Sequence, residues 1–161
     1  IEMICGKRVL DYLNMINEQN HQISVKLSAK MDKTAQAVER LQEENFRLKG
    51  QVGQLVDDMC RKEAERYAGS GSVLIFMDGM DADSVRKLAD AVTQTCQGCC
   101  AVFSRNADGS YKYAMGEKDG DLRRFTKEMN EKLNGRGGGK PFFVQGSVQA
   151  SEKEIRNFFE Q

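Results

Sequence analysis

The sequence predicts an α/β protein in which an N-terminal helical hairpin or coiled coil precedes a small α/β domain with a mixed sheet. Three observations support this fold class. A charged stretch from about Thr34 to Arg66 carries apolar residues at alternating steps of three and four, which is typical of a coiled coil. The continuous apolar run at 73–77 is typical of a strand buried on both faces. Beyond it, strand-like runs alternate with stretches of helical period, which indicates an α/β domain.

Before the long helix, the sequence predicts the end of a strand at 1–5 and then an amphipathic helix with Val9, Leu13 and Ile16 on one side. A second short helical stretch passes through Ile23 and Leu27. The chain begins at Ile1 rather than Met, so we expect a fragment of a larger protein.

The long helix carries a dimerisation seam at positions of type a and d. Its residues are Val38, Leu41, Asn45, Leu48, Val52, Leu55 and Met59. Asn45 is costly in an apolar seam unless it is paired, and its usual role there is to fix register and oligomer number. The first helix could cover the seam by folding back, and so could a second copy of the chain; we expect both.

A flexible stretch, 69–72, separates two predicted domains: a helical oligomerisation region at 1–68 and an α/β domain at 73–161. The strand at 73–77 leads to a helix that starts with Asp81 and Asp83, whose charges favour a helix N-terminus. Strands follow at 100–104 and 111–116, joined by a turn at 106–109, and one face of the third strand is expected to be open. A helix at 120–133, a strand at 142–149 and a final helix with a Ser151–Glu154 capping box complete the domain.

A glycine-rich stretch links that helix to the last strand. It contains Gly135, Arg136, Gly137, Gly138, Gly139 and Lys140, and Pro141 ends it. Glycine permits close approach of backbone N–H groups to a ligand, so a flexible loop of this kind with two cations predicts a cradle for phosphate oxygens. The alternative is a solvated connector.

The residues around this stretch form the most basic part of the chain. Between Lys118 and Lys140 there are seven cations against four acids, and Arg123, Arg124 and Lys127 lie on the preceding helix. Beside a phosphate cradle these cations favour binding of a nucleic-acid backbone. The alternative is an ordinary solvated helix face.

The composition limits other functions. The chain has 161 residues and a formal net charge of zero, so any polyanion site must be local. No apolar run is long enough to cross a bilayer, and we expect a cytoplasmic protein without a membrane partner. Five unevenly spaced cysteines do not resemble a disulfide framework, and Cys96 and Cys99 lack the further ligands of a structural zinc site, which favours packing roles. His21 lies in a polar string and is expected at the surface, so no metal site is predicted.

The stretch from Val73 onward resembles the domain associated with DHH phosphoesterases. That domain also ends alanyl-tRNA synthetases and the long free-standing alanyl-tRNA editing proteins of the AlaX type. The tRNA branch carries a glycine run, a cation, proline, and later glutamine and glycine, which this sequence matches at Gly135, Gly137, Gly138, Gly139, Lys140, Pro141, Gln145 and Gly146. Arg136, Val144 and Ser147 depart from the pattern. The phosphoesterase branch usually has histidine where Lys140 stands.

The segment 1–10 resembles the end of the editing domain in these proteins. Its residue sequence is more similar to that of the free-standing editing proteins than to that of the synthetase. The resemblance implies that the parent protein hydrolyses mischarged alanine tRNA with a zinc ion held upstream of Ile1. This chain would then be non-catalytic and without a cofactor of its own. Its expected partners are alanine-accepting tRNA, bound through the glycine stretch, Gln145 and the helix cations, and a second copy of the chain.

Three alternatives remain at this stage. The chain could be the C-terminal domain of an alanyl-tRNA synthetase, or a purely structural oligomerisation module. It could also belong to a phosphodiesterase acting on short nucleotides, although the sequence contains no Asp-His-His motif.

Overall fold

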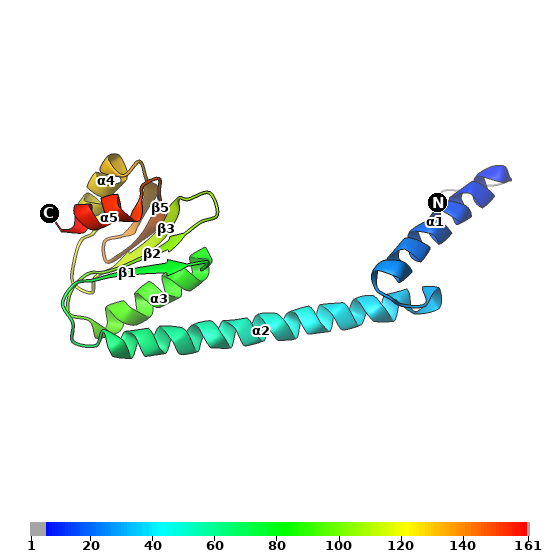
Figure 1. Cartoon of the computed structure of the whole chain (residues 1–161), viewed down its shortest axis with the longest axis horizontal. Coiled ribbons are helices and arrows are strands. Elements are labelled where there is room, and N and C mark those ends of the chain that lie inside the picture. The colour runs from blue at the N-terminus through cyan, green and yellow to red at the C-terminus, as the bar shows by residue number, and fades with distance from the viewer. Residues whose placement is uncertain (1–5, 161) are drawn as a thin grey trace. The chain divides into compact units, whose positions relative to one another are not determined.

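The computed structural model describes residues 6–160 and confirms the α/β fold class. Figure 1 shows the elements in chain order, from helix α1 to helix α5. They are α1 (Lys7–Lys26), η1 (Met31–Lys33), α2 (Thr34–Arg66), β1 (Val73–Asp78), α3 (Ala82–Thr95), β2 (Cys100–Arg105), β3 (Tyr111–Gly116), α4 (Arg123–Lys132), β4 (Arg136–Lys140), β5 (Phe143–Val148) and α5 (Glu152–Phe159). The strand expected at 1–5 lies outside the described residues.

Contacts divide the chain into two units, 1–53 and 54–161. The last turns of α2 belong to the second unit because Cys60 and Ala64 are buried against its core. The flexible composition of 69–72 predicted a boundary between two domains that fold independently. That boundary stays a prediction.

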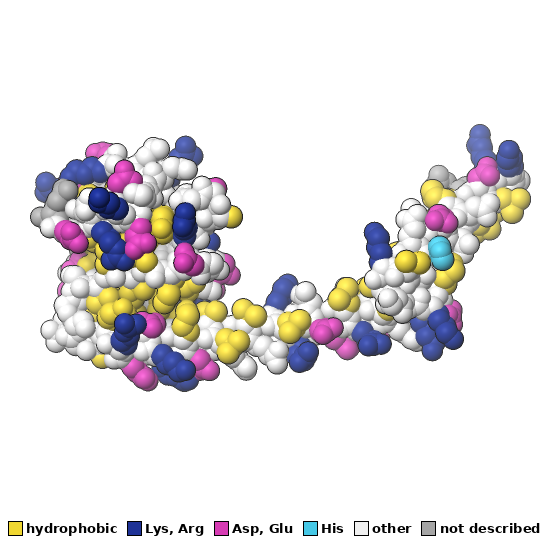
Figure 2. Space-filling view, in the orientation of Figure 1, with side chains coloured by type: hydrophobic (Ala, Val, Ile, Leu, Met, Phe, Trp, Pro, Cys, Tyr) yellow, Lys and Arg dark blue, Asp and Glu magenta, His cyan; other side chains and the backbone are white. Residues whose placement is uncertain are grey.

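In the first unit, α1 is one continuous helix where the sequence indicated two stretches. Ser28, in the left-handed region at φ 49, follows its end. The Asn20 side chain ties α1 to the turn, donating to the carbonyl oxygen of Met31 at 3.0 Å and accepting from the Thr34 hydroxyl at 2.8 Å. The structure thus fixes the turn between α1 and α2, while most large apolar side chains of α1 and of the part of α2 in this unit stay exposed, as the yellow side chains in Figure 2 show.

The second unit is built on a five-stranded sheet of order β1-β2-β3-β5-β4. β1 and β2 run parallel and are connected through α3, and every other neighbouring pair is antiparallel. β1 and β4 are therefore the two edge strands, and β3 lies in the centre.

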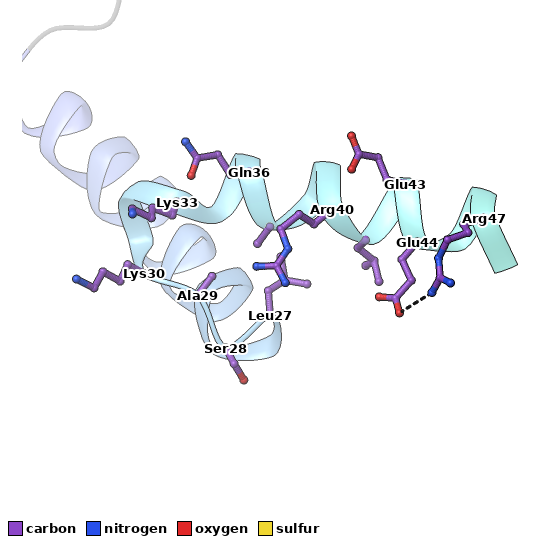
Figure 3. A pocket seen from close by; sticks show the side chains of 12 residues that line it. Leu27, Ser28, Ala29, Lys30, Lys33, Gln36, Arg40, Glu43, Glu44 and Arg47 are labelled. Carbon is purple, nitrogen blue, oxygen red and sulfur yellow. Dashed lines mark ion pairs between the residues drawn. The ribbon is translucent and has the colours of Figure 1, made fainter.

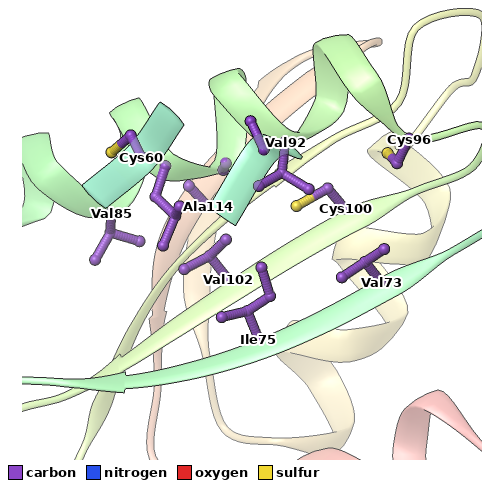
Figure 4. Packing of buried hydrophobic residues seen from close by; sticks show 12 residues of the cluster. Cys60, Val73, Ile75, Val85, Val92, Cys96, Cys100, Val102 and Ala114 are labelled. Carbon is purple, nitrogen blue, oxygen red and sulfur yellow. The ribbon is translucent and has the colours of Figure 1, made fainter. Parts of the chain in front are cut away.

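Each face of the sheet carries its own apolar core. On one face, α3 and the end of α2 pack on the strands around Cys60, Val85, Val92, Cys100 and Val102 (Figure 4). On the other face, α4 and α5 cover a cluster that includes Phe103, Tyr113, Met115, Met129 and Ile155.

The expectation that one face of β3 is open was wrong. The alternation of large and small residues along β3 arises because its two faces meet different layers: Tyr113 packs under α4 and α5, whereas Ala114 packs under α3. Both residues are buried. The small residues serve a close helix contact, since a Cβ on Gly116 would collide with Thr93 of α3.

Side chains cap two helix N-termini of the second unit, and the capping box of α5 was predicted. The Asp81 side chain accepts from the Ser84 N–H at 2.7 Å, and Ser151 and Glu154 form the capping box of α5. Within residues 6–160, no helix combines the length and the apolar character needed to cross a membrane.

Candidate nucleic-acid interface

The glycine-rich stretch forms an edge strand rather than the flexible loop that we expected. Residues Arg136–Lys140 are β4, every one of them is exposed, and they pair antiparallel with β5 from Arg136 opposite Ser147 to Lys140 opposite Phe143. None of the β4 glycines has a positive φ; the turn into the strand uses Asn134 at φ 49. A concave nest of positive-φ amides is therefore absent from β4. An edge strand instead presents a row of outward backbone N–H and C=O groups.

Close packing explains most of the glycines. A Cβ on Gly137 would lie 2.5 Å from the carbonyl oxygen of Gln145 and would collide with the Tyr113 hydroxyl. A Cβ on Gly146, opposite Gly137, would meet the backbone of β4. Gly138 differs, because a Cβ there would meet nothing within 4 Å. The side of β4 at Gly138 is thus open to a ligand that approaches the backbone closely.

Asn130 of α4 holds β4 in place. Its side chain donates to the Gly137 carbonyl oxygen at 3.2 Å and accepts from the Tyr113 hydroxyl at 3.1 Å, while its own carbonyl accepts from the Gly135 N–H at 2.7 Å. Tyr113 is buried, and this burial raises the pKa of its phenol, so the hydroxyl remains a proton donor. The sheet centre, α4 and the edge strand are therefore connected by hydrogen bonds.

The structure brings some of the predicted cations to β4. Lys127 and Arg123 line a hollow of about 390 Å³ together with Gly135 and 137–139. Arg123, however, is engaged by Asp121 at 2.6 Å. Arg124 lies on α4 outside this hollow. In the described part of the chain, five of the seven cations between Lys118 and Lys140 form no ion pair: Lys118, Arg124, Lys127, Arg136 and Lys140.

A second hollow, of about 420 Å³, lies between β4, β5 and α3. Lys140 and Gln145 line it, so Gln145 belongs to this hollow rather than to the one beside α4. Arg86 and Lys87 of α3 line it too, but Asp83 and Asp57 engage them at 3.2 and 3.1 Å. The exposed strand β4 thus has a hollow on each side.

Sequence reasoning missed Phe142. This side chain is 49% exposed, in the turn between β4 and β5, and the Lys140 ammonium lies 5.7 Å from its ring centroid. An exposed aromatic ring beside free cations can stack on a nucleobase. No local signal marked Phe142 as exposed, because the sequence predicted a strand from Phe142 onward, whereas the structure places Phe142 in the turn and begins β5 at Phe143.

This arrangement suits binding of a polyanion. Outward amides can donate to phosphate oxygens, and Arg136 and Lys140 stand at the two ends of the strand. Each of the two hollows beside β4 also has one carboxylate in its lining: Glu131 in the hollow beside α4 and Asp90 in the hollow beside α3.

The four cysteines within residues 6–160 take no part in this surface. Cys96 and Cys100 pack in the core beneath α3. Burial is the main cause that raises the pKa of the Cys99 thiol to about 12, and it raises the pKa of Cys100 further. Across residues 6–160, no group of three or more His, Cys, Asp or Glu side chains is placed to hold a metal ion.

A further hollow, of about 640 Å³, lies in the first unit between the end of α1 and the start of α2 (Figure 3). Lys30, Lys33 and Arg40 line it, but so do Glu43 and Glu44. Arg47, which also lines it, pairs with Glu44 at 3.9 Å. Four cations and two carboxylates thus line this hollow, and its walls come from α2 and the turn that precedes it, so it presents no edge-strand amides of the kind that β4 offers.

The predicted dimerisation seam is open over most of its length. Val38, Leu41, Leu48, Val52 and Leu55 are between 38% and 69% exposed. Asn45 is exposed as well. Met59, the last residue of the seam, instead packs against the core of the second unit. The free part of the seam therefore runs from Val38 to Leu55.

Comparison with known proteins gives the family and its relatives. A family model described as DHHA1 domain matches residues 70–161. The alanine–tRNA ligase of Psychrobacter sp. is 23% identical over 165 residues, covering 95% of this chain and 18% of the ligase. The corresponding ligase of Acholeplasma laidlawii is 30% identical over 79 residues, covering 49% of this chain and 9% of the ligase.

The ligase of Thiobacillus denitrificans is 26% identical and covers 88% of this chain and 18% of its own length. The chain therefore spans about a fifth of the curated relatives or less. Among solved structures, the C-Ala domain of Aquifex aeolicus alanyl-tRNA synthetase is similar over 58% of this chain and 92% of that chain, with 19% identity and a TM-score of 0.49.

Proposed function

Since the chain belongs to the DHHA1 domain family, we propose that its α/β domain binds tRNA as a non-catalytic part of a larger protein. The relatives support tRNA as the polyanion, because those reported above are named as alanine–tRNA ligases. On the same ground we propose an alanine-accepting tRNA, and a ligase rather than a free-standing editing protein as the parent. A zinc-dependent editing site and a cytoplasmic location stay predictions about that parent.

One observation carries the proposal. β4 is an exposed edge strand whose two terminal residues, Arg136 and Lys140, form no ion pair with any described residue. Phosphate contacts supply most of the sequence-independent affinity for nucleic acids, and they need free cations and amide donors at a surface. β4 offers both, and Lys127 and the ring of Phe142 flank it.

RNA binding by β4 would act at a distance from the catalytic site of the parent protein. tRNA is a large ligand, and a second contact with its backbone raises the effective concentration of its acceptor end at a catalytic site elsewhere in the parent. The role requires affinity and orientation, and it requires no reactive group in this chain.

A salt titration tests the proposal. We expect Arg136→Ala with Lys140→Ala to weaken tRNA binding by the whole chain and to reduce the slope of log affinity against log salt by about two, since each lost phosphate contact removes about one counterion. Fluorescence anisotropy of labelled tRNA measures both quantities. The matched control is Lys49→Ala with Lys153→Ala, which removes two exposed lysines, one on α2 and one on α5, that line neither hollow beside β4. Equal tRNA affinities and equal salt slopes for the two double variants would show that β4 does not contact tRNA.

The exposed seam of α2 supports a second role beside RNA binding. Five apolar residues of the seam, Val38, Leu41, Leu48, Val52 and Leu55, stay exposed in the single chain. Exposed apolar residues in a heptad pattern need a partner helix. We therefore propose that two chains pair through α2, so that each dimer presents two copies of β4.

A further inference from the structure

The sheet has a second free edge, and a hollow opens beside it. A space of about 540 Å³ lies on the α4 and α5 side of the sheet, at the start of β1. Its apolar lining includes Leu74, Cys99, Phe125 and Phe159. These four side chains are half-buried. The two aromatic rings meet edge to face with their centroids 5.3 Å apart. The hollow is therefore an aromatic pocket whose walls are already packed in place.

The edge beside this hollow lacks a strand partner. β1 is the terminal strand of the sheet, and in the described structure it pairs with β2 alone. Its outer row of N–H and C=O groups can accept another strand. Val73 and Ile75 pack in the core under α3, whereas Leu74 and Phe76 pack on the α4 and α5 side, where the hollow lies. A strand added to β1 would therefore place alternate side chains over the hollow.

The rim of the hollow is acidic. Glu117, Asp121 and Glu160 line it, against a single cation, Arg156. Arg156 is already engaged: Glu152 holds its guanidinium at 2.6 Å, and the guanidinium lies 4.4 Å from the centroid of Phe76. Arg123 engages Asp121, but Glu117 and Glu160 form no ion pair with any described residue. The rim therefore repels phosphates and favours a cationic ligand.

We propose that the β1 edge docks an extended peptide segment, which pairs with β1 and places an apolar side chain, flanked by lysine or arginine, in the hollow. Main-chain pairing supplies affinity that does not depend on sequence, and the hollow and its acidic rim supply the preference for one side chain and its charged neighbours. Four strand spacings separate this edge from β4, roughly 19 Å. The peptide site and the RNA site can thus be occupied together, and the peptide site does not depend on the proposed RNA binding.

The test uses the full chain labelled with ¹⁵N and three capped peptides of five residues. The first has lysine at both ends, valine at the second and fourth positions and phenylalanine in the centre, so that the ring and both lysines share one face. In the second peptide serine replaces phenylalanine, and in the third glutamate replaces both lysines. We expect the first peptide to shift the amides of 73–76 saturably, the serine peptide to bind about tenfold more weakly, and the glutamate peptide to bind more weakly still.

Charge reversal on the rim gives the matched variants. Glu117→Lys with Glu160→Lys should weaken binding of the lysine peptide about tenfold and strengthen binding of the glutamate peptide. Glu39→Lys on α2 should change the affinity for neither peptide. Equal binding of the three peptides, no binding at millimolar concentration, or shifts at β4 instead of β1 would each overturn the proposal. Shifts of the 73–76 amides on addition of tRNA would overturn it too, because RNA would then occupy this edge.

Discussion

At the scale of single residues, neighbouring glycines of β4 have separable roles. Gly137 is fixed by packing, since a Cβ there would collide with the Tyr113 hydroxyl and would approach the carbonyl oxygen of Gln145. At Gly138, on the same strand, an added Cβ would meet no atom within 4 Å. A methyl group at Gly137 therefore affects the fold, whereas a methyl group at Gly138 projects into the space that a bound backbone would occupy.

Alanine substitution separates the two roles. We expect Gly137→Ala to lower the free energy of unfolding by about 2 kcal/mol, because the added methyl would collide with the Tyr113 hydroxyl and the Gln145 carbonyl oxygen. Gly138→Ala should change that free energy by less than about 0.5 kcal/mol and should still weaken tRNA binding. Urea denaturation and RNA titration of both variants measure these effects. Normal tRNA affinity in Gly138→Ala would show that no ligand comes close to this part of the strand.

The Cys99 thiol provides a test that depends on pH. Its pKa is raised to about 12, first by burial and then by the Glu117 carboxylate, so little thiolate exists near neutral pH. Raising the pKa disfavours the charged thiolate, and alkylation of Cys99 by iodoacetamide should therefore be slow at pH 7 and should accelerate steadily up to pH 10. Peptide mapping with fragmentation by mass spectrometry distinguishes Cys99 from Cys96 and Cys100, which lie in the same tryptic peptide. A rate that levels off between pH 8 and 9 would mean that the thiol is not desolvated.

At the scale of elements, the seam of α2 decides whether the chain pairs with a copy of itself. Leu48→Asp with Leu55→Asp places two charges in the exposed apolar face. We expect the unmodified chain to sediment as a dimer and this variant as a monomer, because a charge buried in a coiled-coil seam is strongly unfavourable. Phe46→Asp is the matched control, since Phe46 is 83% exposed and lies about 200° around the helix from Leu48. A monomeric unmodified chain would contradict the pairing.

The elements themselves were largely predictable. The bounds of α2, the buried runs of β1 and β2 and the capping box of α5 follow from local patterns: heptad spacing, apolar continuity and the Ser151–Glu154 pair. The conformation of the glycine stretch was not predictable in this way. Glycine composition suits a loop, and β4 becomes a strand only because β5 pairs with it and Asn130 anchors it. Both partners act through the tertiary fold.

The candidate site was predictable in part for the same reason. Arg136 and Lys140 stand out in the sequence, and the structure places them at the two ends of β4. Gln145 joins the hollow beside α3, and Asp121 engages Arg123, because side chains sort by strand face and by local charge partners. Phe142 became evident as a surface ring only once the turn between β4 and β5 was defined.

At the scale of the whole molecule, the chain combines surfaces of different character. One sheet edge, β4, is basic and glycine-rich; the other, β1, borders an apolar hollow with an acidic rim; and the helical unit exposes a seam. In a dimer, two copies of β4 could contact RNA together, which raises the apparent affinity without new contacts. In this account the chain holds a polyanion, pairs with its copy and leaves chemistry to other parts of a parent protein.

The most direct test of this account is a map of the backbone amides of the whole chain with and without tRNA. Transverse-relaxation-optimised ¹⁵N spectra should show the largest changes at Gly137–Lys140 and at Lys127 and Phe142, and these changes should disappear as salt is raised. Changes confined to α1 and α2, with the β4 amides unaltered at saturating tRNA, would contradict the assignment of β4 as the RNA-binding strand.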